Sequence, residues 1–410
     1  MISNRAKGAL ADPSPLVVAH FEAAKDAYHP VKNPTGAINL GTAENYLMEE
    51  ELLAWLAKVP PIAGRDMHYE IFRGRAVLRE TLARFLRDAS GITDADPEHI
   101  VIGSGVSSLL ESLAHVLFDE GESLIIPAPY YTGYEEDFSH RFGVNVIPAT
   151  MHEDNGFELD VAILDQVYAQ AVNEGEKVKA ILINNPNNPL GVQYTRPQLE
   201  SLIDFAENRG LQIIADEIYA HSIFDDCHGN FESVLTVGEH YKDSIHVLYG
   251  LAKDFGLSGF KFALCYSTNT DVLAALAVNA YFYNVSTLDQ HVVNAMFLDM
   301  DYVREFLARY KKKLSTAHKY LLIENDETIQ AAILPSQGGH FVFMSLADRL
   351  PEQSPRGEMQ LYENLWSQAK VNITPGQFFG CMQPGWFRLC FANDPKRVKE
   401  AFIRMKRCLP

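Results

Sequence analysis

Leu248-Tyr-Gly-Leu-Ala-Lys253-Asp-Phe-Gly-Leu-Ser-Gly259-Phe-Lys261 is the segment on which the interpretation of this sequence rests. It continues an apolar run that contains Ile245 and Val247, and this run predicts a buried strand. A lysine at the C-terminal end of a buried strand costs free energy unless its amine is paired, deprotonated or used covalently. Lys253 is therefore a candidate catalytic residue, although a lysine in a surface loop is the more common case.

Four further motifs lie in order around Lys253. They are Pro129-Tyr130-Tyr131, Asn187-Asn188-Pro189-Leu190-Gly191, Asp216-Glu217-Ile218-Tyr219 and Pro384-Gly385-Trp386-Phe387-Arg388. Together with Lys253 they resemble the class I/II aminotransferase family of pyridoxal-phosphate (PLP) enzymes, and within it the 1-aminocyclopropane-1-carboxylate (ACC) synthase-like branch. The resemblance spans nearly the whole chain.

The resemblance implies an α/β protein of fold type I, in which helices cover a large domain with a mostly parallel, seven-stranded sheet. A smaller α+β domain is expected from both chain ends. The expected bounds are 1–66 for the N-terminal part of the small domain, 67–289 for the PLP-binding domain and 290–410 for the C-terminal part. A homodimer is also implied, because sites in this family borrow residues across a two-fold interface.

Composition agrees with two domains and limits the partners. A chain of 410 residues is too long for one hydrophobic core. Its formal charge of −18 argues against a nucleic-acid partner, which would require a basic face. The polar start and the lack of an apolar run of about 20 residues predict a cytoplasmic protein with no membrane partner. The 5 cysteines are scattered without a C-x-x-C pair, so neither a metal site nor a disulfide framework is expected.

Residues 178–215 predict a parallel strand–helix–strand unit. Val178 to Ile183 form an apolar run, and a second one begins at Leu211. Between them Thr195 and Gln198 have the spacing of a capping box for a helix near 196–208. Ligands bind at the carboxyl ends of parallel strands, which is where Asn188, Asp216 and Tyr219 fall. Strands are also expected at 100–102, 124–126 and 338–346, and helices at 15–28, 273–293 and 302–321.

The chemistry of these residues suits PLP. A carboxylate such as Asp216 keeps the pyridine nitrogen protonated, so that the ring accepts electrons. Asn188 and Tyr219 can both hydrogen-bond the phenolate oxygen of the ring, and by resemblance the Tyr131 ring stacks on the pyridine. Lys253 is expected to form the Schiff base and then to move the proton at Cα. The predicted catalytic residues are Lys253, Asp216 and Tyr219.

The predicted phosphate site departs from the family pattern. Gly103-Ser-Gly-Val106-Ser107 leads into a helix, whose first N–H groups favour a phosphate, and Val106 and Ser107 match the phosphate-contacting positions. Lys261 stands where the family has an arginine, and Gly250 and Ala252 stand where it has serines. Phe72 replaces a tyrosine that reaches the cofactor phosphate of the other subunit, and it cannot donate that hydrogen bond.

The predicted substrate residues come from both ends of the chain. Arg388 lies in an apolar strand, where a guanidinium is costly unless it meets a carboxylate, so it is the expected clamp for a substrate α-carboxylate. Gly-Thr-Ala43-Glu44-Asn resembles the G-x-A-E-N stretch of ACC synthases, whose alanine and glutamate lie at the substrate. Phe72 is placed at the substrate by the same resemblance.

The function implied is that of a PLP-dependent lyase or transferase that deprotonates the Cα of an α-amino acid. The ACC synthase-like branch suggests γ-elimination or γ-replacement on an S-adenosylmethionine-like substrate, or carbon–sulfur lyase chemistry, in specialised metabolism. Phe72 and the altered phosphate contacts argue against strict ACC synthesis. Two alternatives stay open: an ordinary class I/II aminotransferase, and a binding or regulatory protein on a decayed PLP fold.

Overall fold

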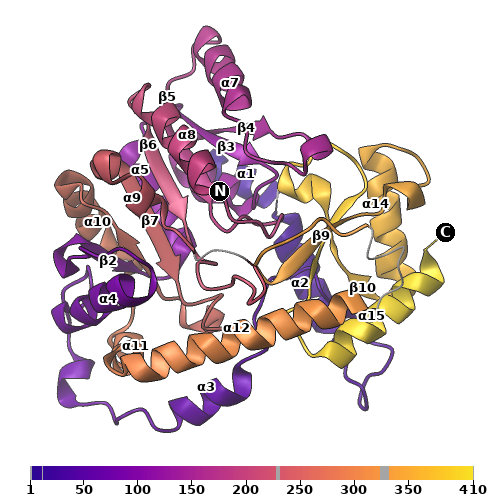
Figure 1. The fold of residues 1–410 in the computed structure, drawn as a ribbon, viewed down its shortest axis with the longest axis horizontal. Helices are drawn as coiled ribbons and strands as arrows, with labels where there is room; N and C mark the ends of the chain where they lie inside the picture. The colour runs from indigo at the N-terminus through magenta and orange to yellow at the C-terminus, as the bar shows by residue number, and fades with distance from the viewer. Residues whose placement is uncertain (1, 12, 228–230, 324–331, 410) are drawn as a thin grey trace.

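A seven-stranded sheet forms the centre of the protein (Figure 1). The structure, a computed structural model, describes residues 2–11, 13–227, 231–323 and 332–409. The strands in spatial order are β2 (Ile100–Gly103), β8 (Ala263–Tyr266), β7 (Ile245–Gly250), β6 (Gln212–Asp216), β5 (Val178–Asn184), β3 (Ser123–Ala128) and β4 (Asn145–Thr150). β8 is antiparallel to both of its neighbours and the other pairs are parallel, so the predicted fold class is confirmed.

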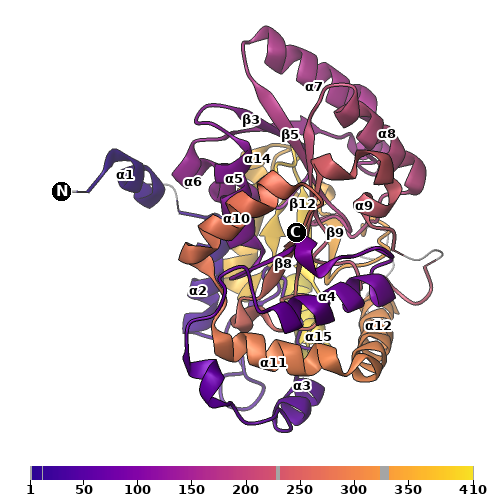
Figure 2. The ribbon, with the colours of Figure 1, turned by 90° about the vertical axis from the view of Figure 1, so that its left-hand side faces the viewer.

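Helices cover both faces of this sheet because its strands are apolar on both sides. Ile181 and Ile183 of β5 join the core on one face, and Ala180 and Leu182 join the core on the other. Figure 2 shows α5, α6 and α10 on one side of the sheet and α8 and α9 on the other. The helices are α1 (Asn4–Ala11), α2 (Pro15–Lys25), α3 (Glu49–Leu56), α4 (Ala76–Ala89), α5 (Val106–Leu117), α6 (Gly133–Phe142), α7 (Val161–Asn173), α8 (Arg196–Glu207), α9 (Val234–Val237), α10 (Thr270–Tyr283), α11 (Thr287–Leu298), α12 (Met300–Ile323), α14 (Pro355–Asn364) and α15 (Pro395–Cys408).

Short helical turns occupy several of the connections. They are η1 (Gly64–Met67), η2 (Pro97–His99), η3 (Glu153–Asn155), η4 (Glu239–Ser244), η5 (Ser258–Phe260), η6 (Ala347–Arg349), the π-helical turn η7 (Leu365–Ala369) and η8 (Gly376–Phe379). The predicted capping box is present at α8, where the Thr195 N–H donates to Gln198 Oε1 over 2.9 Å. The helical region expected over 273–293 is present, but it is divided into α10 and α11. Asn284 is extended, and the Ser286 hydroxyl accepts from the Asp289 N–H and begins α11.

Two smaller sheets lie beside the large one. β9 (Phe341–Ser345), β12 (Trp386–Cys390) and β11 (Thr374–Pro375) form a three-stranded antiparallel sheet. β1 (Ile38–Asn39) pairs in parallel with β10 (Val371–Asn372), which joins the two ends of the chain. This pairing supports our proposal that residues 1–66 and 290–410 form one small domain. α12, which has 24 residues, runs along the lower edge of the molecule and links the two parts (Figure 1).

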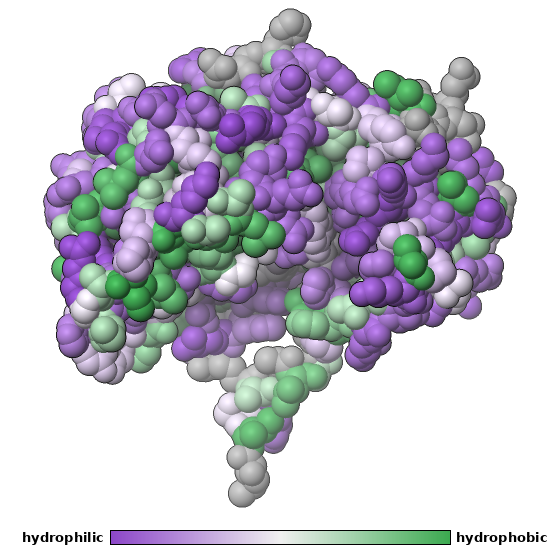
Figure 3. Space-filling view, turned by 90° about the horizontal axis from the view of Figure 1, so that it is seen from below, coloured by the Kyte–Doolittle hydropathy of each residue, from purple (hydrophilic) through white to green (hydrophobic). Residues whose placement is uncertain are grey.

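Two further features concern membrane contact and the state of the cysteines. Among the described residues, every helix is too short or too polar to span a lipid bilayer. The five cysteines are all free thiols, in agreement with their scattered positions. Figure 3 shows hydrophobic residues grouped on one half of the face seen from below, and an N-terminal segment that projects from the body.

Glu358 of α14 holds the loop that leads into β12. Its buried carboxylate accepts from the Gln377 N–H over 2.9 Å and from the Gly385 N–H over 2.6 Å. We expect Glu358→Ala to lower the free energy of unfolding by roughly 2–5 kcal/mol, because both N–H groups lose their acceptor inside the protein. Chemical denaturation measures this change. Glu363→Ala, an exposed position on the same helix, is the control and should change stability by less than about 0.5 kcal/mol; equal effects would contradict the assignment.

Candidate active site

A cavity of about 520 Å³ opens at the carboxyl ends of β5, β6 and β7. These three parallel strands are in register, with Asn184 of β5 beside Asp216 of β6 and Asp216 beside Leu248 of β7. All but one of the predicted site residues line this cavity: Ala43, Glu44, Val106, Ser107, Tyr131, Asn188, Asp216, Tyr219, Lys253, Lys261 and Arg388. The sequence motifs, which lie up to 345 positions apart, thus meet in one place.

The amine of Lys253 lies in this cavity in an environment that favours its neutral form. Its Nζ donates to the backbone oxygen of Ala43 over 2.5 Å and lies 6.0 Å from the centroid of the Tyr219 ring. Burial and the nearby Arg388 guanidinium lower the pKa of Lys253 to about 8. A larger fraction of this amine is therefore unprotonated near neutral pH than of an ordinary lysine, as a nucleophilic amine requires.

Asp216 is held by two hydrogen bonds at the end of β6. Tyr134 OH donates to its Oδ2 over 2.7 Å and the Ile218 N–H donates to its Oδ1 over 3.2 Å. Burial raises the pKa of Asp216 to about 6. A cationic group placed against this carboxylate would favour its ionised form, so the site suits a protonated ring nitrogen. Tyr134 was missed by the sequence analysis; its position one helical turn after Tyr131 was the available signal.

Arg388 reaches the cavity from β12. Its Nη1 donates to Asn188 Oδ1 over 2.8 Å, and its Nη2 donates to the backbone oxygen of Gly41. The bond to Asn188 leaves the amide N–H groups of Asn188 available toward the cavity. The guanidinium also lies 4.6 Å from the centroid of the Phe379 ring. A buried guanidinium with carbonyl partners alone is suited to an incoming carboxylate.

Glu44, which we expect at the substrate, lines the cavity with a fixed carboxylate. Ser258 Oγ donates to its Oε1 over 2.8 Å, and Tyr46 OH donates to its Oε2 over 2.9 Å. The neighbouring Ala43 carbonyl receives the Lys253 amine, so Glu44 lies next to the reacting group. The wall beyond it comes from α2 and includes Leu16 and Phe21.

Unsatisfied atoms at the site match the chemistry of PLP. Among the residues that the structure describes, Tyr219 OH and Arg388 Nε are buried with no hydrogen-bond partner. Such groups are costly unless a ligand completes them. The ring of Tyr131 lies directly against Gly133. A Cβ at residue 133 would lie 2.4 Å from Tyr131 Cε1, so a glycine is needed here for the ring to keep this position. The phenol donor, the aromatic wall, the acid and the amine all fit a flat pyridine with an aldehyde and a phenolic oxygen.

The turn before α5 forms the end of the cavity at which we expect the phosphate of PLP. Gly105 has φ of +93° and caps α5, so the N–H groups of Val106 and Ser107 begin the helix at the cavity. The Lys261 side chain passes this turn, since a Cβ at Gly105 would lie 3.8 Å from Lys261 Cδ. A Cβ at Gly250 would lie 3.0 Å from Val106 Cγ2. Val106 therefore occupies space that a serine at 250 would need, which explains one departure from the family pattern.

Asp137 of α6 is a second residue that the sequence analysis missed. It lines the cavity with Ser104 to Ser107. Burial raises the pKa of Asp137 to about 8, so this carboxyl is protonated near neutral pH. Its Oδ2 is buried without a partner in the described part of the chain. A protonated carboxyl can donate to a phosphate, which partly offsets the missing serines.

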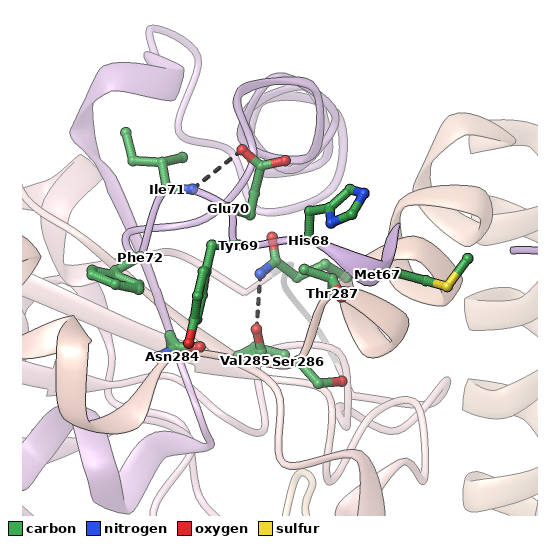
Figure 4. Close-up of a pocket in the computed structure, with 11 residues that line it drawn as sticks. Met67, His68, Tyr69, Glu70, Ile71, Phe72, Asn284, Val285, Ser286 and Thr287 are labelled. Atoms are coloured by element: carbon green, nitrogen blue, oxygen red, sulfur yellow. Dashed lines mark hydrogen bonds between the residues drawn. The ribbon is translucent and has the colours of Figure 1, made fainter. Parts of the chain in front are cut away.

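Phe72 is the predicted site residue that lies outside this cavity. It lines a separate pocket of about 520 Å³ formed by residues 67–72 and 284–287 (Figure 4). Its ring meets the Tyr281 ring edge-on at 5.4 Å. Figure 4 shows the Tyr69 ring beside Phe72, and Tyr69 is 99% exposed. The role of Phe72 at a partner's site stays a prediction, because within one chain it does not touch the cavity.

The sequence model of class I and II aminotransferases matches residues 35–404. The chain belongs to this family. It is 34% identical over 403 residues to 1-aminocyclopropane-1-carboxylate synthase 1 of Oryza sativa subsp. indica, covering 93% of this chain and 82% of that protein. It is 33% identical over 405 residues to 1-aminocyclopropane-1-carboxylate synthase of Malus domestica, covering 93% and 84%.

Solved structures agree on the fold. A Thermus thermophilus aspartate aminotransferase variant superposes with a TM-score of 0.80 at 23% identity over 100% of both chains. An aromatic aminotransferase from Pyrococcus horikoshii superposes with a TM-score of 0.76 at 21% identity, covering 96% of this chain and 98% of that one. The protein is a PLP-dependent enzyme of the ACC synthase-like type. Membership of this family favours an enzyme over the alternative of a binding protein on a decayed fold.

Lys261 tests the assignment of the phosphate end. We expect Lys261→Arg to tighten PLP binding by about 5-fold, because a guanidinium can contact the phosphate through two hydrogen bonds rather than one. Equilibrium dialysis of the apoenzyme with PLP measures the affinity. Lys312→Arg, on exposed α12, is the matched control and should leave the affinity unchanged. An unchanged affinity in Lys261→Arg would place the phosphate elsewhere.

Proposed function

We propose that this enzyme removes the Cα proton of an S-adenosylmethionine-like amino acid and expels the γ-sulfonium group by elimination or replacement. The observation that carries the proposal is the pairing of charges in the cavity. Arg388 and Glu44 both line the cavity, and both lie close enough to the Lys253 amine for their charges to act on it. A substrate with an α-carboxylate and a cationic side chain matches these two charges.

Each residue has a definite task in this reaction. Arg388 holds the α-carboxylate and thereby fixes which Cα bond stands next to the Lys253 amine. Lys253 takes the proton from Cα, aided by its lowered pKa. PLP, when bound, supplies the electron-accepting ring on which the Cα carbanion is stabilised. Asp216 holds a proton at the ring nitrogen, and Tyr219 with Asn188 donates toward the phenolic oxygen.

Glu44 supports a sulfonium substrate in particular. Its two oxygens are already fixed by Ser258 and Tyr46, so the carboxylate has a defined position beside the Lys253 amine. A fixed carboxylate stabilises a nearby cation without reorganising. The apolar side chains of α2 provide a surface for the rest of a large substrate. Phe72, in place of a tyrosine, supports a specialised product rather than ACC itself.

Absorbance spectra with added substrates decide the reaction. We expect S-adenosylmethionine to change the PLP spectrum and to release methylthioadenosine, measured by chromatography, while ordinary amino acids do neither. Lys253→Ala should lower turnover by at least about 10³-fold because the amine moves the Cα proton. Stoichiometric formation of a keto acid and of the pyridoxamine form of the cofactor with ordinary amino acids would instead make the enzyme an aminotransferase.

We also propose that the protein is a homodimer in a reducing, cytoplasmic compartment. The free cysteines support the compartment. An exposed apolar surface around the Phe72 pocket supports the dimer. Tyr69 is 99% exposed and Phe282 is 83% exposed, and Met67 and Tyr281 are exposed beside them. Large apolar patches of this kind are typical of protein interfaces, and Phe72 would face the neighbouring site only in such an assembly.

A charged residue introduced on this apolar surface tests the proposed dimer. We expect Phe282→Glu to convert a species of twice the chain mass into a monomer, because an unpaired carboxylate at a packed interface is costly. Light scattering after size-exclusion chromatography measures the mass. Val172→Glu, at an exposed apolar position on α7, is the control and should leave the mass unchanged. A wild-type monomer, or a dimer unaffected by Phe282→Glu, would contradict the proposed interface.

A further inference from the structure

A chain of hydrogen-bonded, buried polar groups lies behind the cavity. None of these groups has a role in the proposed reaction. Asp254, Ser222, Tyr310 and His340 are each 0% exposed. Ser222 Oγ lies 2.5 Å from Asp254 Oδ1 and 2.6 Å from Tyr310 OH. Tyr310 OH lies 2.6 Å from His340 Nε2. Asp254 lies in the loop after β7, Ser222 in the turn after β6, Tyr310 on helix α12 and His340 at the start of β9. This series of hydrogen bonds therefore joins the large sheet to the small one.

The direction of the hydrogen bonds between these four residues depends on whether Asp254 carries a proton. Burial and the Lys253 and Arg388 charges lower the pKa of His340, so the ring is neutral. With Asp254 ionised, His340 Nε2–H donates to Tyr310, Tyr310 donates to Ser222, and Ser222 donates to Asp254. With Asp254 protonated, the same three bonds run in the opposite direction. In both states each contact carries one proton. Loss of the Tyr310 hydroxyl removes both 2.6 Å contacts and leaves only the longer, 3.4 Å contact between Ser222 Oγ and His340 Nε2.

Asp254 anchors the chain at the catalytic loop. Besides Ser222, its carboxylate accepts from Tyr249 OH over 3.0 Å and from the His221 N–H over 3.0 Å. Asp254 follows Lys253 directly, but it does not line the cavity. Its hydrogen bonds to residues 221 and 222 therefore fix the Lys253 loop against the turn that carries Tyr219.

The other end of the chain contacts Tyr219. The His340 and Tyr219 rings meet edge-on, with centroids 5.3 Å apart and planes at 90°. Phe341 packs on Tyr219 in the same way at 5.4 Å and 88°. Since Tyr219 OH has no partner among the described residues, these two rings hold the phenol in place. His340 is in turn oriented by its bond to Tyr310.

We infer that Tyr310 and His340 are positioning residues for Tyr219, so that a buried chain from α12 and β9 sets the tilt of the phenol that faces the cofactor. This inference rests on the proposed role of Tyr219. A misplaced phenol stabilises the phenolic oxygen of PLP less well, and the Schiff-base nitrogen then holds its proton to higher pH. The titratable and charged groups that act on the Lys253 amine, namely Arg388, Cys390, Glu44 and Asp216, are not themselves altered by a substitution at 310.

The test is a pH titration of the absorbance band of the PLP-loaded protein. We expect Tyr310→Phe to raise the midpoint by about half a pH unit, roughly a threefold change in proton affinity. Tyr219→Phe should raise it further. In the Tyr219→Phe background, Tyr310→Phe should add no shift, because the group that it positions is gone. Tyr302→Phe removes a hydroxyl on the same helix that is buried and has no partner among the described residues, and it should leave the midpoint unchanged.

Each other outcome overturns the inference. A shift in Tyr219→Phe without one in Tyr310→Phe would remove the positioning role and leave the role of Tyr219 intact. Equal shifts from Tyr310→Phe in both backgrounds would mean that the chain acts through another group. No shift in Tyr219→Phe would overturn the role of Tyr219 and this inference with it. If Tyr310→Phe does not fold, Ser222→Ala, which breaks the chain at the next group, is read in the same way.

Discussion

The parallel, in-register pairing of β5, β6 and β7 is the constraint on which the rest of the structure depends. It places the ends of three strands side by side, and a polar residue of the candidate site lies at or shortly after each of these ends. Asn188 follows β5, Asp216 ends β6 and Lys253 follows β7. Backbone hydrogen bonds between buried strands allow little slip, because a shift by one residue would exchange the two faces of the sheet. The spacing of acid, amide and amine is thus fixed before any ligand binds.

The electrostatics of the cavity follow from this arrangement. Lys253, Asp216 and Arg388 are charged or chargeable groups held away from water, and burial moves the pKa of Lys253 down and that of Asp216 up. Each shift disfavours the charged form of a group that has no close counter-ion. A ligand that brings a cation to Asp216 and an anion to Arg388 restores the balance. The charged forms of these groups therefore become favourable when a ligand brings the opposite charges, which favours ligands with the complementary pattern.

Much of the fold and of the candidate site could be predicted from the sequence, because the informative residues occur in local motifs. The strand–helix–strand unit, the βα phosphate turn and the residues at strand ends all have short-range signals. Residues that act through long-range packing could not be found in this way. Asp137 is an unremarkable acid on a helix until α6 brings it to Ser107. The break between α10 and α11 consists of three non-helical residues, 284–286, within an otherwise helical pattern.

The altered phosphate end shows how a site can change as a group rather than residue by residue. Glycine at 250 and valine at 106 are complementary in volume, since a side chain at 250 would require Val106 to move. Lys261 adopts a left-handed backbone conformation, with φ of +51°, which brings its stem past Gly105. With the protonated Asp137 beside Ser107, these residues would offer a phosphate one flexible cation and one neutral acid in place of several small hydroxyl donors. A phosphate bound in this way depends more on the N-terminus of α5 and on a single charge. The fixed geometry of the site then comes from the ring end, where Asp216, Tyr131 and Tyr219 are held by the sheet and by packed aromatic rings.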